Sequence, residues 1–254
     1  MSEITVNDTQ HVREITLNRP KKRNALTQPM YQALANAIES VKDTPDVSVI
    51  LIKSEGEFFC AGNDLHDFAR AAQESHISEN VRFMHALMEC DIPVVACIQG
   101  NAIGIGVTML LHCDIVVAAA NASFALPFVE LGLVPEFSSS YLLPRMAGHR
   151  IASKYLLLGE PFTAEEAMNV GIISHVAFEN DVESITQAIV TKLSQSPRSA
   201  VVHTKALLKA NQREVALHMN DELDVFVSHL QSPAAQEAVA ALLEKRPVNK
   251  EIYR

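Results

Sequence analysis

Three short apolar segments, separated by stretches with helical spacing, most restrict the fold of this chain. Residues 48–53, 93–98 and 114–119 have the composition of strands that are buried on both faces. Helices are predicted after Thr27, the expected N-cap, and near 79–90, because apolar residues recur there at three- and four-residue intervals. Strands that alternate with helices are typical of an α/β fold with largely parallel strands.

The two ends of the chain follow other patterns. Residues 3–7 and 12–17 alternate strand-type and polar residues and predict a short β-hairpin, whereas residues 54–65 are interpreted as a loop. After about residue 180 the strand signal ends, and four helices are predicted, near 180–195, 198–211, 213–230 and 233–245. We therefore expect an α/β core over residues 1–195 and a C-terminal helical segment over residues 196–254.

Composition excludes several classes of protein. A chain of 254 residues with 48% hydrophobic residues suits one large domain with a sizeable core, and a net charge of −9 disfavours nucleic-acid binding. The N-terminus has no signal-peptide pattern, and no apolar run reaches the roughly 20 residues of a membrane span. The cysteines lack CxxC spacing and the ten histidines are scattered, so we expect reduced thiols, a cytoplasmic location and no metal site. These cysteines are Cys60, Cys90, Cys97 and Cys113.

Two glycine-containing loops follow predicted central strands. The stretch Gly100–Gly106 does not match GxGxxG, because Met109 occupies the third glycine position. It is either a close-packed turn or a place where backbone N–H groups bind an anion or oxyanion. The second loop, residues 59–65, reads FCAGNDL. Since the carboxyl ends of neighbouring parallel strands share one crevice, two backbone donors from these loops can converge on one oxygen.

Among the carboxylates, Glu136 has the most apolar sequence neighbours. It lies between Pro135 and Phe137, whereas Glu130 lies six residues upstream. An apolar setting raises a carboxyl pKa towards neutrality, as a general base requires. The alternative is a surface glutamate paired with Arg145.

Other candidate groups have simpler interpretations. Residues 138–140 are three serines that we expect to cap the following helix, and Cys60 is interpreted as a small packing residue. The basic run Lys21-Lys22-Arg23 is either a solvated loop or a clamp for phosphates, and Lys245-Arg246 is a further candidate for the second role.

Taken in order, several segments resemble the crotonase superfamily, the enoyl-CoA hydratases/isomerases. The resemblance covers about residues 3–180 and is carried by residues 18–26, 59–65, 93–106, 113–115, 130–136 and 159–167. It implies a spiral of ββα units, C-terminal helices that mediate a homotrimer or a dimer of trimers, and an acyl-CoA thioester as substrate without any cofactor.

The resemblance also implies roles for particular residues. The thioester oxygen is held by the backbone N–H groups of Asn63 and Ile105. The segment around Lys22–Ala25 contacts the nucleotide part of CoA, and the loop Ala61–Leu65 lines the CoA and acyl site. The implied binding residues are Lys22, Arg23, Ala25, Ala61, Gly62, Asn63, Asp64, Leu65 and Gly104.

The reaction is indicated by the catalytic positions. Hydratases of the superfamily carry two glutamates, where this chain has Thr108 and Phe128. Neither side chain titrates near neutral pH, so hydration is disfavoured. Glu136 falls where the 3-enoyl-CoA isomerases carry their single catalytic glutamate, so the resemblance implies conversion of a cis or trans 3-enoyl-CoA to the 2-trans-enoyl-CoA, in the oxidation of unsaturated fatty acids.

Three alternatives remain open at this point. The chain could retain hydratase activity, or it could catalyse another superfamily reaction, since aryl-CoA dehalogenases place a nucleophilic aspartate at the position of Glu136. It could also be a non-catalytic acyl-CoA-binding protein, in which Thr108 and Phe128 have replaced catalytic glutamates and activity has been lost.

Overall fold

The computed structural model describes residues 2–74 and 77–253 and contains a six-stranded sheet at its centre. The strands of this sheet are β1 (Ile4–Thr9), β2 (Val12–Leu17), β3 (Val49–Ser54), β5 (Val94–Ile98), β7 (Ile115–Ala119) and β10 (His175–Ala177). Their order is β1-β2-β3-β5-β7-β10. β1 and β2 pair antiparallel and the other neighbours pair parallel. The predicted hairpin and the parallel α/β core are therefore confirmed.

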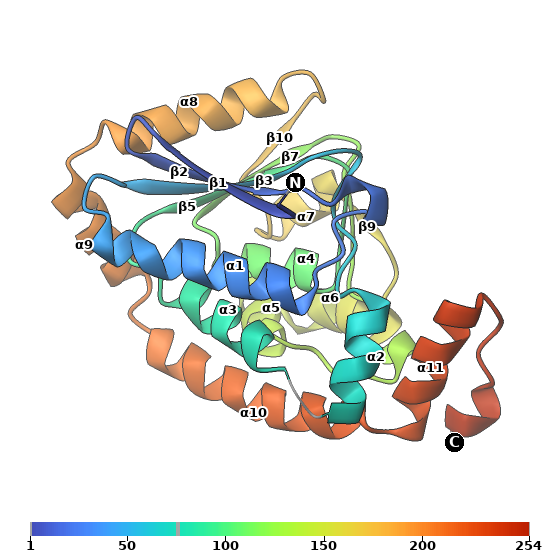
Figure 1. The fold of residues 1–254 in the computed structure, drawn as a ribbon. Coiled ribbons are helices and arrows are strands. Elements are labelled where there is room, and N and C mark those ends of the chain that lie inside the picture. The colour runs from blue at the N-terminus through green and yellow to red at the C-terminus, as the bar shows by residue number, and fades with distance from the viewer. Residues whose placement is uncertain (1, 75–76, 254) are drawn as a thin grey trace.

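The central strands β3, β5 and β7 are buried on both faces, which explains the continuous apolar runs in the sequence. The helices that follow are α1 (Gln28–Glu39), α2 (Leu65–Glu74), α3 (Ser78–Met88), α4 (Ile105–Thr108), α5 (Ser139–Ala147), α6 (His149–Ser153), α7 (Ala164–Asn169) and α8 (Val182–Ser194). α8 covers one face, where Val182 and Val190 pack with Leu51 and Val95. α1 and α3 pack together on the other side (Figure 1).

A second, four-stranded sheet lies beside the first and was not expected. Its strands are β4 (Phe58–Cys60), β6 (Asn101–Ile103), β8 (Ser123–Ala125) and β9 (Phe162–Thr163), in that order. The interpretation of residues 54–65 as a loop is thus wrong for β4, and the stretch Gly100–Gly106 contains β6. Strands of two or three residues are too short to show an alternating pattern in the sequence.

Short helical turns complete the chain before its C-terminal part. They are η1 (Pro20–Lys22), η2 (Ser40–Asp43), η3 (Met109–His112), η4 (Val129–Leu131) and η5 (Lys154–Leu158), with η6 (Lys250–Tyr253) near the end. As predicted, Thr27 caps α1, because its side chain accepts a hydrogen bond from the N–H of Met30. The expected serine cap of α5 is wrong: Ser138 donates its hydroxyl to the carbonyl of Val215 instead.

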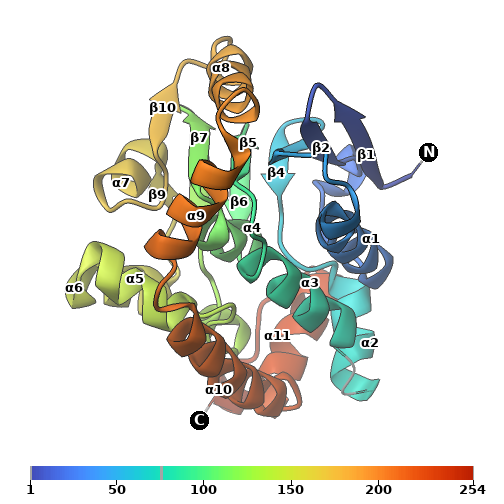
Figure 2. The ribbon, with the colours of Figure 1, turned by 90° about the vertical axis from the view of Figure 1, so that its left-hand side faces the viewer.

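Three helices, α9 (Arg198–Leu208), α10 (Gln212–Leu230) and α11 (Pro233–Glu244), form the C-terminal part, as the sequence predicts. α10 packs against α3 and α5, and α11 packs against α2 (Figure 2). The C-terminal helices therefore close over the α/β core rather than standing apart from it. Within the described residues, no helix is both long and apolar enough to cross a membrane.

Candidate active site

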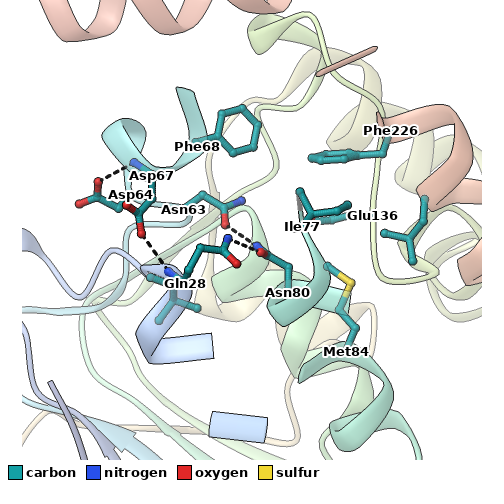
Figure 3. Close-up of a pocket in the computed structure, with 12 residues that line it drawn as sticks. Gln28, Asn63, Asp64, Asp67, Phe68, Ile77, Asn80, Met84, Glu136 and Phe226 are labelled. Carbon is teal, nitrogen blue, oxygen red and sulfur yellow. Dashed lines mark hydrogen bonds between the residues drawn. The ribbon is translucent and has the colours of Figure 1, made fainter. Parts of the chain in front are cut away.

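A pocket lies where α1, α2, α3 and α10 meet the segment that precedes α5. Figure 3 shows its lining, with Asn63, Asn80 and Gln28 on one side and Glu136 and Phe226 on the other. The lining residues are Leu26, Gln28, Asn63, Asp64, Asp67, Phe68, Ile77, Asn80, Met84, Glu136, Leu223 and Phe226. The pocket thus combines an apolar wall with a few polar groups, which is the usual character of a small-molecule site.

Glu136 is the buried carboxyl group of this pocket. The residue is 2% exposed, and its Oε1 is buried without a hydrogen-bond partner among the described residues. Burial, and secondarily the charge of Glu222, raise the pKa of Glu136 to about 8. Pairing with Arg145 is excluded, because that guanidinium lies over the ring of Tyr141 and donates to the Tyr141 carbonyl.

The backbone around Glu136 is held by several hydrogen bonds. Phe137 and Ser138 adopt φ angles of 59° and 56°, a left-handed conformation that costs roughly 1–3 kcal/mol for each such residue. His112 offsets part of this conformational cost, because its Nε2–H donates to the Phe137 carbonyl at 2.8 Å and its ring stacks on the Phe137 ring. Burial lowers the pKa of His112 to about 3, so this imidazole is neutral. Ser139 donates its hydroxyl to the carbonyl of Glu136.

The loops that follow β4 and β6 are brought together by close packing. Cys60 and Ala102 pair in parallel, and a Cβ atom on Gly106 would lie 2.8 Å from the Cys60 carbonyl oxygen. Only glycine permits that approach. In the hydrogen bonding of the described residues, the N–H groups of Asn63 and Ile105 have no protein acceptor. Both follow the ends of adjacent strands, so two free donors lie at one edge of the sheet.

The side chain of Asn63 belongs to a polar network that sequence reasoning missed. Its Oδ1 accepts from the hydroxyl of Tyr31 at 2.6 Å and from the amide of Asn80 at 3.3 Å. The amide of Gln28 donates to Asn80 Oδ1 at 2.6 Å. These residues come from three separate segments, so their spacing in the sequence gives no sign of the network.

The basic segment lies directly beside the loop Ala61–Asp64. Ala61 N–H donates to the Arg23 carbonyl, and Leu26 N–H donates to the Gly62 carbonyl. Lys22 and Arg23 are exposed, and Arg23 lies over the ring of Phe58. The structure therefore brings the basic segment and the glycine loop together.

Asp64 differs from the other expected binding residues. Its carboxylate pairs with Arg19 at 2.8 Å and accepts hydrogen bonds from the N–H groups of His66 and Asp67, at the start of α2. Burial acts to raise the pKa of Asp64, but Arg19 and the two N–H groups outweigh it and hold this pKa below its ordinary value. This side chain is thus engaged in fixing the loop, although the residue also lines the pocket. Leu65 begins α2, and Gly104 (φ 55°) precedes Ile105 at the start of α4.

Burial and ion pairing define the surroundings of the other residues that the sequence analysis singled out. Thr108 and Phe128 are both buried, and Thr108 Oγ1 has no partner in the described part of the chain. Burial raises the pKa of Cys60 to about 12, so its thiol stays neutral, as expected of a packing residue. The further basic candidate, Arg246, forms ion pairs with Glu237 and Glu244 rather than standing free. No cluster of three potential metal ligands exists among residues 2–74 and 77–253.

These features define an α/β protein with a buried carboxyl group and two backbone donors at the carboxyl ends of neighbouring strands. The model of the enoyl-CoA hydratase/isomerase family matches residues 7–251. The chain belongs to this family and is an enzyme of the crotonase superfamily.

Relatives of this chain bear names of two reaction types. The 2,3-dehydroadipyl-CoA hydratase of Escherichia coli is 33% identical over 97% of both chains. The enoyl-CoA delta isomerase 2 of Rattus norvegicus is 32% identical over 83% of this chain and 55% of its own length. The solved structure of Pseudomonas aeruginosa OdaA superposes with a TM-score of 0.92 and 38% identity, over 96% of this chain and 99% of that one. Fold and family are therefore established, and the choice of reaction depends on the site.

Proposed function

We propose that this protein is an enoyl-CoA delta isomerase, which moves the double bond of a cis or trans 3-enoyl-CoA to give 2-trans-enoyl-CoA in the oxidation of unsaturated fatty acids. One observation carries the proposal: Glu136 is a buried carboxyl group with a free oxygen in the pocket. The family resemblance supports it, because it implies that Thr108 and Phe128 stand where the hydratases carry their two glutamates.

A single carboxylate is chemically sufficient for this reaction. Ionised Glu136 removes a proton from C2 of the 3-enoyl thioester, and the electron pair delocalises to give a dienolate. Protonated Glu136 then returns the proton to C4, which leaves the double bond between C2 and C3. The raised pKa of about 8 suits both steps, because Glu136 both accepts and releases a proton near neutrality. As written, the reaction uses no metal, redox cofactor or added water.

The dienolate carries negative charge on the thioester oxygen. In this proposal the N–H groups of Asn63 and Ile105 stabilise that oxygen, and each such donor is worth roughly a hundred- to thousandfold in rate. Lys22 and Arg23 bind CoA phosphates, and the backbone of Ala25 contacts the nucleotide. Residues 61–65 and Gly104 line the thioester and acyl site. These roles are supported by the hydrogen bonds that join the basic segment to the loop Ala61–Asp64, and by the two N–H groups of Asn63 and Ile105 that have no acceptor among the described residues.

Hydration is the second candidate, favoured by one observation: a relative that is 33% identical over nearly its whole length is named a hydratase. Hydration needs a base for water and an acid for carbon. Thr108 and Phe128 provide neither, so we rank this reaction below isomerisation.

The deciding experiment incubates the enzyme separately with 3-hexenoyl-CoA and crotonyl-CoA. We expect 2-hexenoyl-CoA to form from the first and little 3-hydroxybutyryl-CoA from the second. Glu136→Gln should reduce isomerase turnover by several orders of magnitude while the binding of a saturated acyl-CoA persists. Unchanged turnover in this variant would exclude the mechanism, and binding without any C2 proton exchange in the wild type would indicate a non-catalytic acyl-CoA-binding protein.

A further inference from the structure

A second buried carboxyl group, Glu222, lies next to the pocket and has no part in the reaction as proposed above. Glu222 is 7% exposed and lies on α10, where its neighbour Leu223 and the next-turn residue Phe226 line the pocket. A buried glutamate is costly unless hydrogen bonds or a function compensate for its burial.

One carboxylate oxygen of Glu222 is fully engaged. Oε1 accepts from both the N–H and the hydroxyl of Ser140, and His218 Nε2 lies 3.6 Å away. The same His218 nitrogen is 2.8 Å from Ser140 Oγ. Burial raises the pKa of Glu222 above its ordinary value, and the hydrogen bonds from Ser140 oppose this rise because they favour the ionised carboxylate. The other oxygen, Oε2, is buried without a partner among the described residues.

The segment that binds Glu222 is also the segment that carries Glu136. Ser139, the residue before Ser140, donates its N–H and its hydroxyl to the Glu136 carbonyl. Ser138 donates to the Val215 carbonyl on α10. Hydrogen bonds thus connect the backbone at Glu136 and the carboxylate of Glu222 through three consecutive serines.

The other charged groups on the elements packed against α10 have partners of their own. Arg145 of α5 lies over Tyr141, Arg82 of α3 pairs with Glu39 and Glu79, Asp67 of α2 pairs with Arg70, and Glu237 of α11 pairs with Arg246. On α10 itself, Asp221 and Asp224 are exposed, and Glu214 accepts from the Tyr141 hydroxyl. His218 and Glu136 are therefore the titratable groups that interact with Glu222.

We propose that Glu222 is a positioning residue of the isomerisation: the negative charge of its carboxylate, held by Ser140, favours the protonated form of Glu136 that follows proton removal from C2. The inference rests on the proposed function, and it assigns a role to a residue on the C-terminal helices. Repulsion between the two buried carboxylates contributes to the raised pKa of Glu136. The two groups then titrate as a coupled pair.

The test follows the titration of Glu136 by ¹³C NMR in protein labelled at the glutamate Cδ, with no substrate present. Glu136 is assigned by the resonance that Glu136→Gln removes. In Glu222→Gln and Glu222→Leu, both of which remove the charge, we expect the midpoint to fall from about 8 by roughly one pH unit. Glu222→Asp keeps the charge and should restore most of the wild-type midpoint.

The same variants give a kinetic readout. In Glu222→Gln the acid limb of kcat/KM should move by the same amount, and kcat should fall about threefold with little change in KM, because a weaker base abstracts the proton more slowly. Glu214→Gln on the same helix is the matched control and should behave as wild type. A Glu136 midpoint that is unchanged in both charge-removing variants, or not restored by aspartate, would overturn the proposal. Because the NMR titration needs no turnover, this result is independent of whether the isomerase assignment holds.

Discussion

At the scale of single residues, the proposed isomerisation depends on how strongly Glu136 holds a proton. Its raised pKa follows from burial in an apolar pocket and from the neighbouring charge of Glu222. The sequence indicated the first cause, because Glu136 is flanked by Pro135 and Phe137. It gave no indication of the second, since Glu222 is 86 positions away on another helix and meets Glu136 only in the folded chain.

The pH dependence of catalysis follows directly. A base with a pKa of about 8 is mostly protonated at pH 6, so kcat/KM should rise about tenfold per pH unit between pH 6 and 7 and level off above pH 8. Initial rates with 3-hexenoyl-CoA across this range measure the profile. A profile that is flat from pH 5 to 8 would contradict an ionised Glu136 as the base.

The free energy of unfolding should fall as the pH rises, whereas kcat/KM should increase. The pKa of Glu136 is higher in the folded state than its ordinary 4.5, so the folded protein retains this proton more tightly than the unfolded chain. Its contribution is fully present below pH 4.5 and is lost as the pH rises to about 8, at up to ~1.4 kcal/mol per pH unit. Urea unfolding at pH 5 and pH 8 should therefore show a smaller loss of stability in Glu136→Gln than in wild type. Equal losses would argue against a buried, protonated carboxyl group.

At the scale of elements, the sequence predicted the long strands and most of the long helices, but it missed the ten-residue helix α2 and the short strands. The apolar runs of β3, β5 and β7 and the helical spacing of α1 are long enough to show their periods. β4, β6, β8 and β9 have two or three residues each, and they owe their existence to pairing between distant segments. The two loops that carry Asn63 and Ile105, the proposed donor loops, were nevertheless predicted, because glycines mark them in the sequence. The donor role of these two N–H groups came from the family resemblance and stays a prediction.

Close contact between the two donor loops gives an element-scale prediction. Gly106→Ala would place a Cβ atom 2.8 Å from the Cys60 carbonyl, so the loops must separate. We expect a loss of roughly 1–3 kcal/mol in stability and a fall in kcat of about a hundredfold. Thermal unfolding and turnover with 3-hexenoyl-CoA measure these effects.

Gly148→Ala is the matched control for this variant. It introduces the same methyl group at a strained φ of 78°, but nothing lies within 4 Å of the new atom. Its turnover should stay near that of the wild type. If the two variants lose activity equally, the result would contradict the prediction that Gly106 aligns the loops that carry Asn63 and Ile105.

At the scale of the whole molecule, the C-terminal helices complete the pocket. Leu223 and Phe226 of α10 line it, and Phe226 meets Phe68 of α2 edge-on with ring centroids 6.3 Å apart. A division of the chain at residue 195 therefore separates one wall of the pocket from the rest. The sequence predicted these helices but not their contact with the site, because amphipathic spacing identifies a buried face without identifying what covers it.

Oligomeric state remains a prediction at this scale. Large apolar side chains are exposed on α5, η5 and α7, including Met146, Leu158 and Met168. Exposed apolar surface of this kind marks contact sites between proteins. We expect light scattering to give a mass of three or six times the 27.9 kDa chain. A monomer at micromolar concentration would contradict the expected trimer.

A crystal structure with a bound, unreactive acyl-CoA such as hexanoyl-CoA would show directly which groups surround the reacting carbons. The proposal predicts that a carboxylate oxygen of Glu136 lies about 3–3.5 Å from C2. It also predicts that the thioester oxygen lies about 2.7–3.1 Å from the backbone nitrogens of Asn63 and Ile105. A structure in which Glu136 turns away and another acid faces C2 would contradict the isomerase assignment.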